Sequence, residues 1–136
     1  MKGSYLLLIE LKDDKTIQVG KLGKIFFRKG FYVYVGSALN GLEHRINRHL
    51  RLEKKVHWHI DYLLGSAKIV NVFLRESTGR CECKIADELS NKLEFVAGFG
   101  CSDCKCKSHL FYGSHVKIIQ AIENLQMEHY SPNKNA

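Results

Sequence analysis

One acidic side chain stands out because it lies among apolar neighbours at helical spacing. Glu82 falls inside the apolar stripe of a helix expected over about residues 80–92. That stripe is formed by Cys81, Ile85, Ala86, Leu89 and Leu93. A carboxylate on a core-facing stripe must be paired, hydrogen-bonded or bound to a metal, because burying an isolated charge is costly. Alternatively, Glu82 stays solvated in the first helical turn, where the helix dipole favours an acid.

A second expected helix, over about residues 40–52, carries two side chains suited to phosphate chemistry. Arg45 and His49 are four positions apart and therefore stack on one helix face. They border a buried stripe that is formed by Leu42, Ile46 and Leu50, so we expect them to reach over a sheet without being buried. An arginine can offer two parallel donors to phosphate oxygens, and a histidine can act as an acid or a base. A solvated basic helix edge is the alternative interpretation.

Tyrosines lie in two expected strands, at residues 5–11 and 30–36. Tyr5 begins the first strand, and Tyr32 and Tyr34 share one face of the second because they are two residues apart. A phenol near an activated water can relay a proton, although its ordinary pKa of about 10 requires help. Packing in an aromatic core is the alternative for these tyrosines.

The composition indicates one globular domain with a polyanionic partner. The chain has 136 residues, of which 45% are hydrophobic and 26% charged, and we expect a single domain over residues 1–130 with a flexible tail at 131–136. Lys and Arg outnumber Asp and Glu by 21 to 14, which gives a net charge of +7 and favours nucleic acid as the partner, or else only a soluble basic surface. No apolar run approaches the roughly 20 residues that span a bilayer, so we expect a cytoplasmic protein without membrane contact.

The cysteines could hold a metal ion. Five is an odd number, which excludes a complete disulfide framework and favours thiols or metal ligands. Four possible zinc ligands lie close together in the sequence: Cys101, Cys104, Cys106 and His109. Zinc sites usually combine such a cluster with a distant second pair, and Cys81 and Cys83 could supply that pair only if the fold brings them close. Structural thiols in a loop are the alternative.

A short helix is expected near Trp58 to Leu64, ended by Gly65. His57 and Asp61 lie at a spacing that would let them share a metal ion, or instead pair with each other and cap the structure around Trp58. Trp58 is expected in the core and not as a stacking platform for a base.

The remaining chain is expected to form smaller elements. They are a short hairpin at 17–27, a strand at 69–74, short strands at 95–99 and 110–112, and a last helix from the N-cap Ser114 to about residue 128.

Together these motifs resemble the GIY-YIG nuclease superfamily, in particular its small stand-alone Uri-type proteins. The resemblance covers about residues 3–112 and is carried by Gly3-Ser4-Tyr5, Tyr34-Val35-Gly36, Arg45, His49 and Glu82. Two features depart from the family pattern. The first motif has serine where the family has isoleucine, and 29 positions separate Tyr5 from Tyr34, so residues 13–29 must be an insertion.

The resemblance implies an α/β (α+β) fold with a small central antiparallel sheet of about three strands, flanked by helices and extended by C-terminal strands and a helix. It implies Mg²⁺ or Mn²⁺ on Glu82 and a catalytic set of Tyr5, Tyr34, Arg45 and His49. Residues expected to contact the substrate are Tyr32, Gly36, Ser37 and Arg48. The expected function is metal-dependent hydrolysis of phosphodiester bonds in DNA by an endonuclease. The alternatives are a non-cleaving nucleic-acid-binding module with the same fold and a zinc-stabilised interaction domain.

Overall fold

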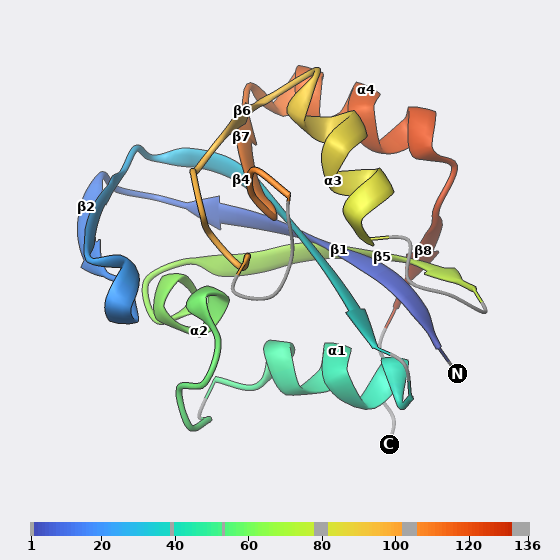
Figure 1. The fold of residues 1–136 in the computed structure, drawn as a ribbon, viewed down its shortest axis with the longest axis horizontal. Coiled ribbons are helices and arrows are strands. Elements are labelled where there is room, and N and C mark those ends of the chain that lie inside the picture. The colour runs from blue at the N-terminus through green and yellow to red at the C-terminus, as the bar shows by residue number, and fades with distance from the viewer. Residues whose placement is uncertain (1, 39, 53, 78–81, 102–105, 132–136) are drawn as a thin grey trace.

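Two long strands form the centre of the molecule. The computed structural model describes residues 2–38, 40–52, 54–77, 82–101 and 106–131. Strands β1 (Gly3–Leu11) and β4 (Gly30–Ala38) pair antiparallel along their whole length. Nearly every residue of β1 is buried, because β1 has a strand on each side and helices over both faces (Figure 1). This position explains why its sequence is almost continuously apolar.

The main sheet has six strands, so the predicted sheet of about three strands is wrong. Its order is β6-β7-β4-β1-β5-β8, and every neighbouring pair is antiparallel. The four strands outside the central pair are β5 (Lys68–Glu76), β6 (Glu94–Phe95), β7 (Leu110–Gly113) and β8 (Glu128–Tyr130). β6 and β8 have two and three residues, too few to produce a recognisable alternation of apolar and polar residues.

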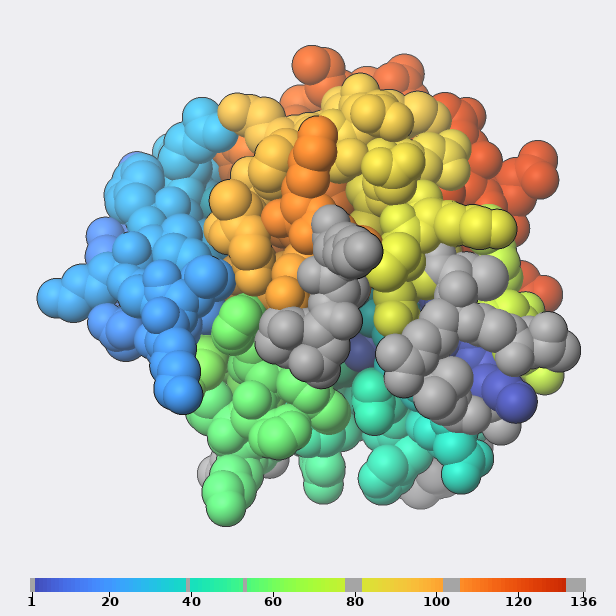
Figure 2. Space-filling model, in the orientation of Figure 1, coloured from blue at the N-terminus to red at the C-terminus, as the bar shows by residue number. Residues whose placement is uncertain are grey.

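The segment predicted to be an insertion forms a separate small sheet. β2 (Lys15–Gln18) and β3 (Lys24–Phe27) pair antiparallel, and a 3₁₀ turn, η1 (Gly20–Leu22), connects them. This hairpin stands at one end of the molecule (Figure 2). It buries Ile17, Val19 and Phe27 in the same core as α1 and α2. The predicted hairpin is therefore confirmed.

Four helices cover the two faces of the six-stranded sheet (Figure 1). On one side lie α1 (Leu42–Leu50) and α2 (His59–Leu64), and on the other lie α3 (Glu82–Ser90) and α4 (His115–Leu125). Alternate residues of β1 divide between two cores: Tyr5 and Leu7 pack with α1 and α2, while Leu6 and Leu8 pack with α3 and α4. Within the described part of the chain, no helix is both long and apolar enough to cross a membrane.

Helix ends follow the capping rules only in part. Ser114 caps α4 as predicted, and its Oγ accepts a hydrogen bond from the Lys117 amide. α1 is capped by Gly41 in the left-handed conformation, which favours glycine. The helix therefore begins at Leu42, later than the expected start at about residue 40. Of the predicted flexible tail, residues 132–136 lie outside the described part of the chain.

Gly36 is required by the position of Tyr5. The two residues lie opposite each other in the β1–β4 pair, and the Tyr5 ring covers the Gly36 Cα. A Cβ at residue 36 would stand 2.3 Å from both Cζ and Oη of Tyr5, far inside van der Waals contact. Since Tyr5 is only 2% exposed, the ring has no space to move into.

We therefore expect Gly36→Ala to lower the free energy of unfolding by roughly 2–3 kcal/mol, as overpacking of a core does. Urea unfolding measures this change. Gly65→Ala is the matched control, because Gly65 has helical dihedrals and a Cβ there would meet only ordinary contacts, so its stability should stay unchanged or rise slightly. Equal stability of the two variants would contradict the packing argument.

Candidate functional site

A buried hydrogen bond links a strand tyrosine to a helix histidine. The Oη of Tyr5 on β1 lies 2.7 Å from Nε2 of His49 on α1, and each residue is 2% exposed. The prediction that His49 would border the apolar stripe without being buried is therefore wrong. α1 packs closely enough for the imidazole to sit between the rings of Tyr5 and Trp58, with centroids 5.4 Å and 5.7 Å away.

Burial keeps both members of this pair uncharged near neutral pH. Desolvation, together with the nearby charges of Arg48, Lys54 and Arg45, lowers the pKa of His49 to about 4, although the Asp61 charge opposes this shift. Desolvation also raises the pKa of Tyr5 well above its ordinary value. A neutral imidazole can accept the phenol proton at Nε2. Its Nδ1 has no hydrogen-bond partner among the described residues.

A second phenol belongs to the same site. Tyr34 on β4 presents its ring edge to His49, with centroids 6.2 Å apart. Burial raises the pKa of Tyr34, and the Asp61 charge raises it further. The two tyrosines also act on each other, because Tyr34 raises the pKa of Tyr5. Two adjacent strands and α1 thus place two phenols and an imidazole together.

The charges of Arg45, Glu82 and Asp61 act on both phenols. Arg45 on α1 lowers the pKa of Tyr5 and of Tyr34, whereas Glu82 at the start of α3 raises both. Glu82 is half-buried, with its Oε2 shielded from solvent. Of the five residues predicted to form the catalytic and metal-binding set, Tyr5 and Tyr34 both contact His49. Arg45 lies on the same helix as His49, and Glu82 is connected to the two tyrosines through its charge.

Trp58, predicted to be a core residue, separates two arginines. The Arg45 guanidinium carbon lies 5.0 Å from the centroid of the Trp58 ring, and that of Arg48 lies 4.4 Å from it. Arg45 also donates to the Ser37 carbonyl at 2.8 Å. Trp58 is only half-buried. Trp58 forms part of the wall of the site, a role that sequence reasoning missed. The i, i+3 spacing of Arg45 and Arg48 offered a signal, because it places both arginines on one side of the helix.

Asp61 binds Arg48 and the backbone next to Trp58. Its carboxylate oxygens accept from the Arg48 guanidinium at 3.2 Å and 3.1 Å and from the amides of His57 and Trp58 at 2.8 Å and 2.9 Å. Burial alone would raise the pKa of Asp61, but these hydrogen bonds outweigh it and lower the pKa. The arrangement is the cap around Trp58 that the sequence offered as an alternative to a metal site.

The four residues predicted to contact substrate have different partners in the structure. Arg48 is occupied by Asp61 and by the Lys55 carbonyl. Gly36 lies beneath the Tyr5 ring, and Ser37 contributes its carbonyl to Arg45. Tyr32 turns its hydroxyl toward the Arg28 carbonyl, at 2.6 Å. Gly36 and Ser37 therefore contact catalytic candidates, whereas Arg48 and Tyr32 bind other groups.

A separate group of possible metal ligands lies beside α3. The ligand atoms of Cys83, Cys106 and His109 all lie within 4.8 Å of one another. The fold therefore brings Cys83 to the cysteine-rich segment, as a zinc site would need. Cys81 and Cys104, the other cysteines named in that prediction, lie outside the described residues. Cys101 instead directs its thiol to the Phe99 carbonyl at 3.5 Å.

Comparison with protein families matches residues 4–130 to the family described as Domain of unknown function DUF123. No curated protein and no solved structure matches the chain. This match corrects the resemblance to the GIY-YIG superfamily. That resemblance depended on short motifs of a few residues each, whereas the family match extends over almost the whole chain.

The buried imidazole makes stability depend on pH. Because the pKa of His49 is lower in the folded state than the ordinary value of about 6.5, the unfolded chain binds more protons between pH 6.5 and 4. We expect the free energy of unfolding to fall as the pH drops through this window, with a His49 contribution of up to roughly 3 kcal/mol. Urea titrations between pH 7 and 4.5 measure it.

His49→Gln should flatten this dependence, although His59 and His109, whose pKa values burial also lowers, will leave a residual slope. His44→Gln is the matched control, since His44 is exposed on the same helix. A His49→Gln slope equal to that of the control would show that the imidazole titrates normally.

The Arg48–Asp61 pair should be structural. Asp61→Asn leaves the guanidinium without its carboxylate in a largely buried position, and we expect a loss of roughly 3 kcal/mol in the free energy of unfolding. Asp13→Asn, at an exposed turn, should change it by less than about 0.5 kcal/mol. Thermal and urea unfolding compare the two, and similar values would mean that the pair contributes little.

Proposed function

Because this chain belongs to the DUF123 family, a domain of unknown function, we propose its activity from the residues of its own candidate site. We propose that the protein is an endonuclease that hydrolyses phosphodiester bonds in DNA and depends on a divalent metal ion. The observation that carries the proposal is the buried Tyr5–His49 hydrogen bond, with Arg45 and Glu82 both acting on the tyrosines. A proton acceptor, a phosphate-binding cation and a metal-binding carboxylate are the groups that this hydrolysis needs.

Glu82 is suited to hold the metal ion. Mg²⁺ is commonly bound by one or two carboxylates together with substrate phosphate and water, and does not need a cage made only of protein ligands. The half-buried carboxylate of Glu82, with one oxygen shielded from solvent, fits that pattern, as it does for Mn²⁺. When bound, the ion supplies Lewis acidity that offsets negative charge on the phosphate oxygens.

Tyr5 and His49 are suited to move a proton. In the tautomer with the proton on Nδ1, the Tyr5 hydroxyl donates to Nε2 of His49. The Tyr5 oxygen can take a proton from an attacking water as its own proton passes to Nε2, so no isolated phenolate forms in a buried setting. The raised pKa of Tyr5 and the lowered pKa of His49 both support a pair that starts neutral.

Arg45 is suited to hold the scissile phosphate. Its Nη1 donates to Ser37 and its plane lies over Trp58, which orients the guanidinium while leaving other N–H groups for phosphate oxygens. The net charge of +7 supports a polyanionic substrate.

We also propose a cytoplasmic location.

The test is conversion of supercoiled plasmid to nicked and linear forms with Mg²⁺ or Mn²⁺. We expect Glu82→Gln, Arg45→Ala and Tyr5→Phe each to slow cutting by roughly 100-fold or more. Two matched controls remove the same charge at exposed positions: Glu88→Gln on α3 and Arg51→Ala after α1. They should cut within about threefold of the original protein.

Two outcomes would contradict the proposal. If plasmid stays intact with either metal while a gel-shift assay shows binding, the protein is a nucleic-acid-binding module. If Glu82→Gln and Glu88→Gln cut equally, the activity belongs to another site or to a contaminant. Circular dichroism of each variant confirms that a lost activity is not lost folding.

A further inference from the structure

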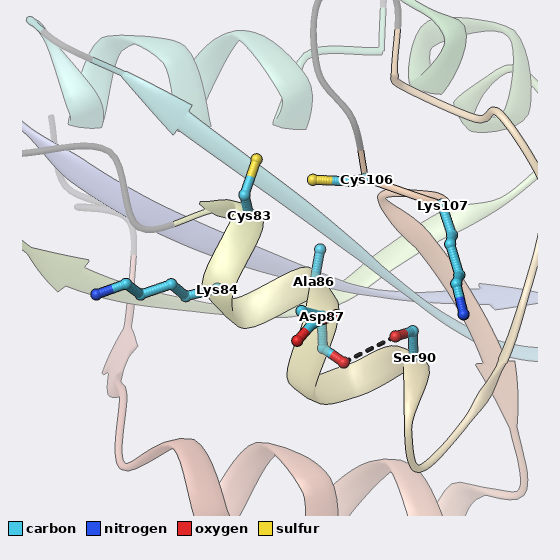
Figure 3. Close-up of a pocket in the computed structure, with 7 residues that line it drawn as sticks. All are labelled: Cys83, Lys84, Ala86, Asp87, Ser90, Cys106 and Lys107. Carbon is cyan, nitrogen blue, oxygen red and sulfur yellow. Dashed lines mark hydrogen bonds between the residues drawn. The ribbon is translucent and has the colours of Figure 1, made fainter.

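A pocket beside α3 has two thiols at its wall. It has a volume of about 420 Å³ and is lined by Cys83, Lys84, Ala86, Asp87, Ser90, Cys106 and Lys107. Cys83 projects from the second residue of α3, and Cys106 comes from the segment that precedes β7. In Figure 3 the Cys83 thiol projects away from α3 and the Cys106 thiol is directed toward it. His109 completes the group, with all ligand atoms within 4.8 Å of one another.

This spacing is close to that of a bound zinc ion. Zinc–sulfur and zinc–nitrogen bonds of about 2.3 Å and 2.1 Å place tetrahedral ligands roughly 3.5–4 Å apart. The ligand atoms, within 4.8 Å of one another, are therefore about 1 Å from that spacing. Cys83 is exposed, so its side chain has room to rotate toward the other ligands.

His109 is held in place by the sheet. Its amide donates to the Phe99 carbonyl at 2.9 Å, and its carbonyl accepts from the Val35 amide at 2.9 Å. The residue is 6% exposed. A ligand fixed in this way needs little ordering when a metal binds, which favours binding.

We propose that Cys83, Cys106 and His109 bind one zinc ion. Two thiolates and an imidazole form a soft ligand set that selects zinc over Mg²⁺, whereas the Glu82 carboxylate suits the harder ion. Two thiolates neutralise the zinc charge. The remaining tetrahedral position is left for a water or another donor.

Zinc at this position would tie α3 to the segment before β7. Cys83 directly follows Glu82, so the ion would fix the first turn of the helix that carries the carboxylate. This consequence rests on the proposed function, but the zinc site itself does not.

The test is zinc content by elemental analysis of the reduced full-length protein, together with the absorption spectrum of the cobalt-substituted form. We expect roughly one zinc ion per chain and thiolate-to-cobalt charge-transfer bands. Cys83→Ser and Cys106→Ser should each lose stoichiometric zinc and weaken those bands. Cys101→Ser is the matched control, because the Cys101 thiol is directed to the Phe99 carbonyl, and it should retain both signals.

Three results would overturn the site. The first is a reduced protein that binds no zinc when zinc is supplied. The second is a Cys83→Ser variant that keeps the full amount. The third is a stable Cys83–Cys106 disulfide, seen by mass spectrometry, whose reduction restores no metal binding. Since Cys83 is exposed, its serine variant should fold, and circular dichroism checks this. Plasmid cutting is measured separately: absence of cutting with zinc retained would reject the proposed function and leave the zinc site standing.

Discussion

The close approach of the Tyr5 ring to Gly36 is the constraint on which the site depends. It fixes the register of the two central strands, because any larger residue at 36 would push the ring away. It also directs the Tyr5 hydroxyl toward α1, where His49 meets it. A slip of one residue would turn Tyr5 to the opposite face of the sheet, toward α3 and α4. Strand pairing and site geometry are thus set by the same contact.

The neutral groups of the site are buried more deeply than the charged side chains of Arg45 and Glu82. Tyr5, Tyr34 and His49 lie where desolvation keeps them uncharged, and the charges of Arg45 and Glu82 are held at half-buried positions near them. Two guanidinium groups lie against the ring of Trp58, and the Asp61 carboxylate neutralises that of Arg48. Only one of the two arginines therefore remains available to a phosphate.

Much of the central structure could be predicted from the sequence. The continuous apolar runs of β1 and β4 indicate doubly covered strands, and the periodicity of Leu42 and Ile46 indicates the buried face of α1. The strands predicted at 69–74 and 110–112 are confirmed as β5 and β7. The strand predicted at 95–99 is only Glu94–Phe95, and β8 was not predicted, because both are too short to show a period. The start of α1 was misplaced because a left-handed glycine, and not a side-chain oxygen, ends the preceding loop.

The candidate site was predictable as a set of residues but not as a set of contacts. Residue types indicated phosphate chemistry, yet the burial of His49 and the stacking on Trp58 depend on how α1 and α2 pack on the sheet. Likewise, no spacing rule connects Cys83 to His109, which lie on different elements. Such proximity arises from the six-strand order, which short motifs do not encode.

The last strand affects how this protein behaves toward its own copies. Among the described residues, β8 pairs with β5 at Val72, Phe73 and Leu74, so it covers the middle of this sheet edge. Charged residues, Lys68 and Glu76, stand at the two ends of β5, and such residues discourage edge-to-edge pairing. A chain shortened before Glu128 would lose this cover and present an apolar strand to its neighbours, which makes the C-terminal strand a guard against aggregation.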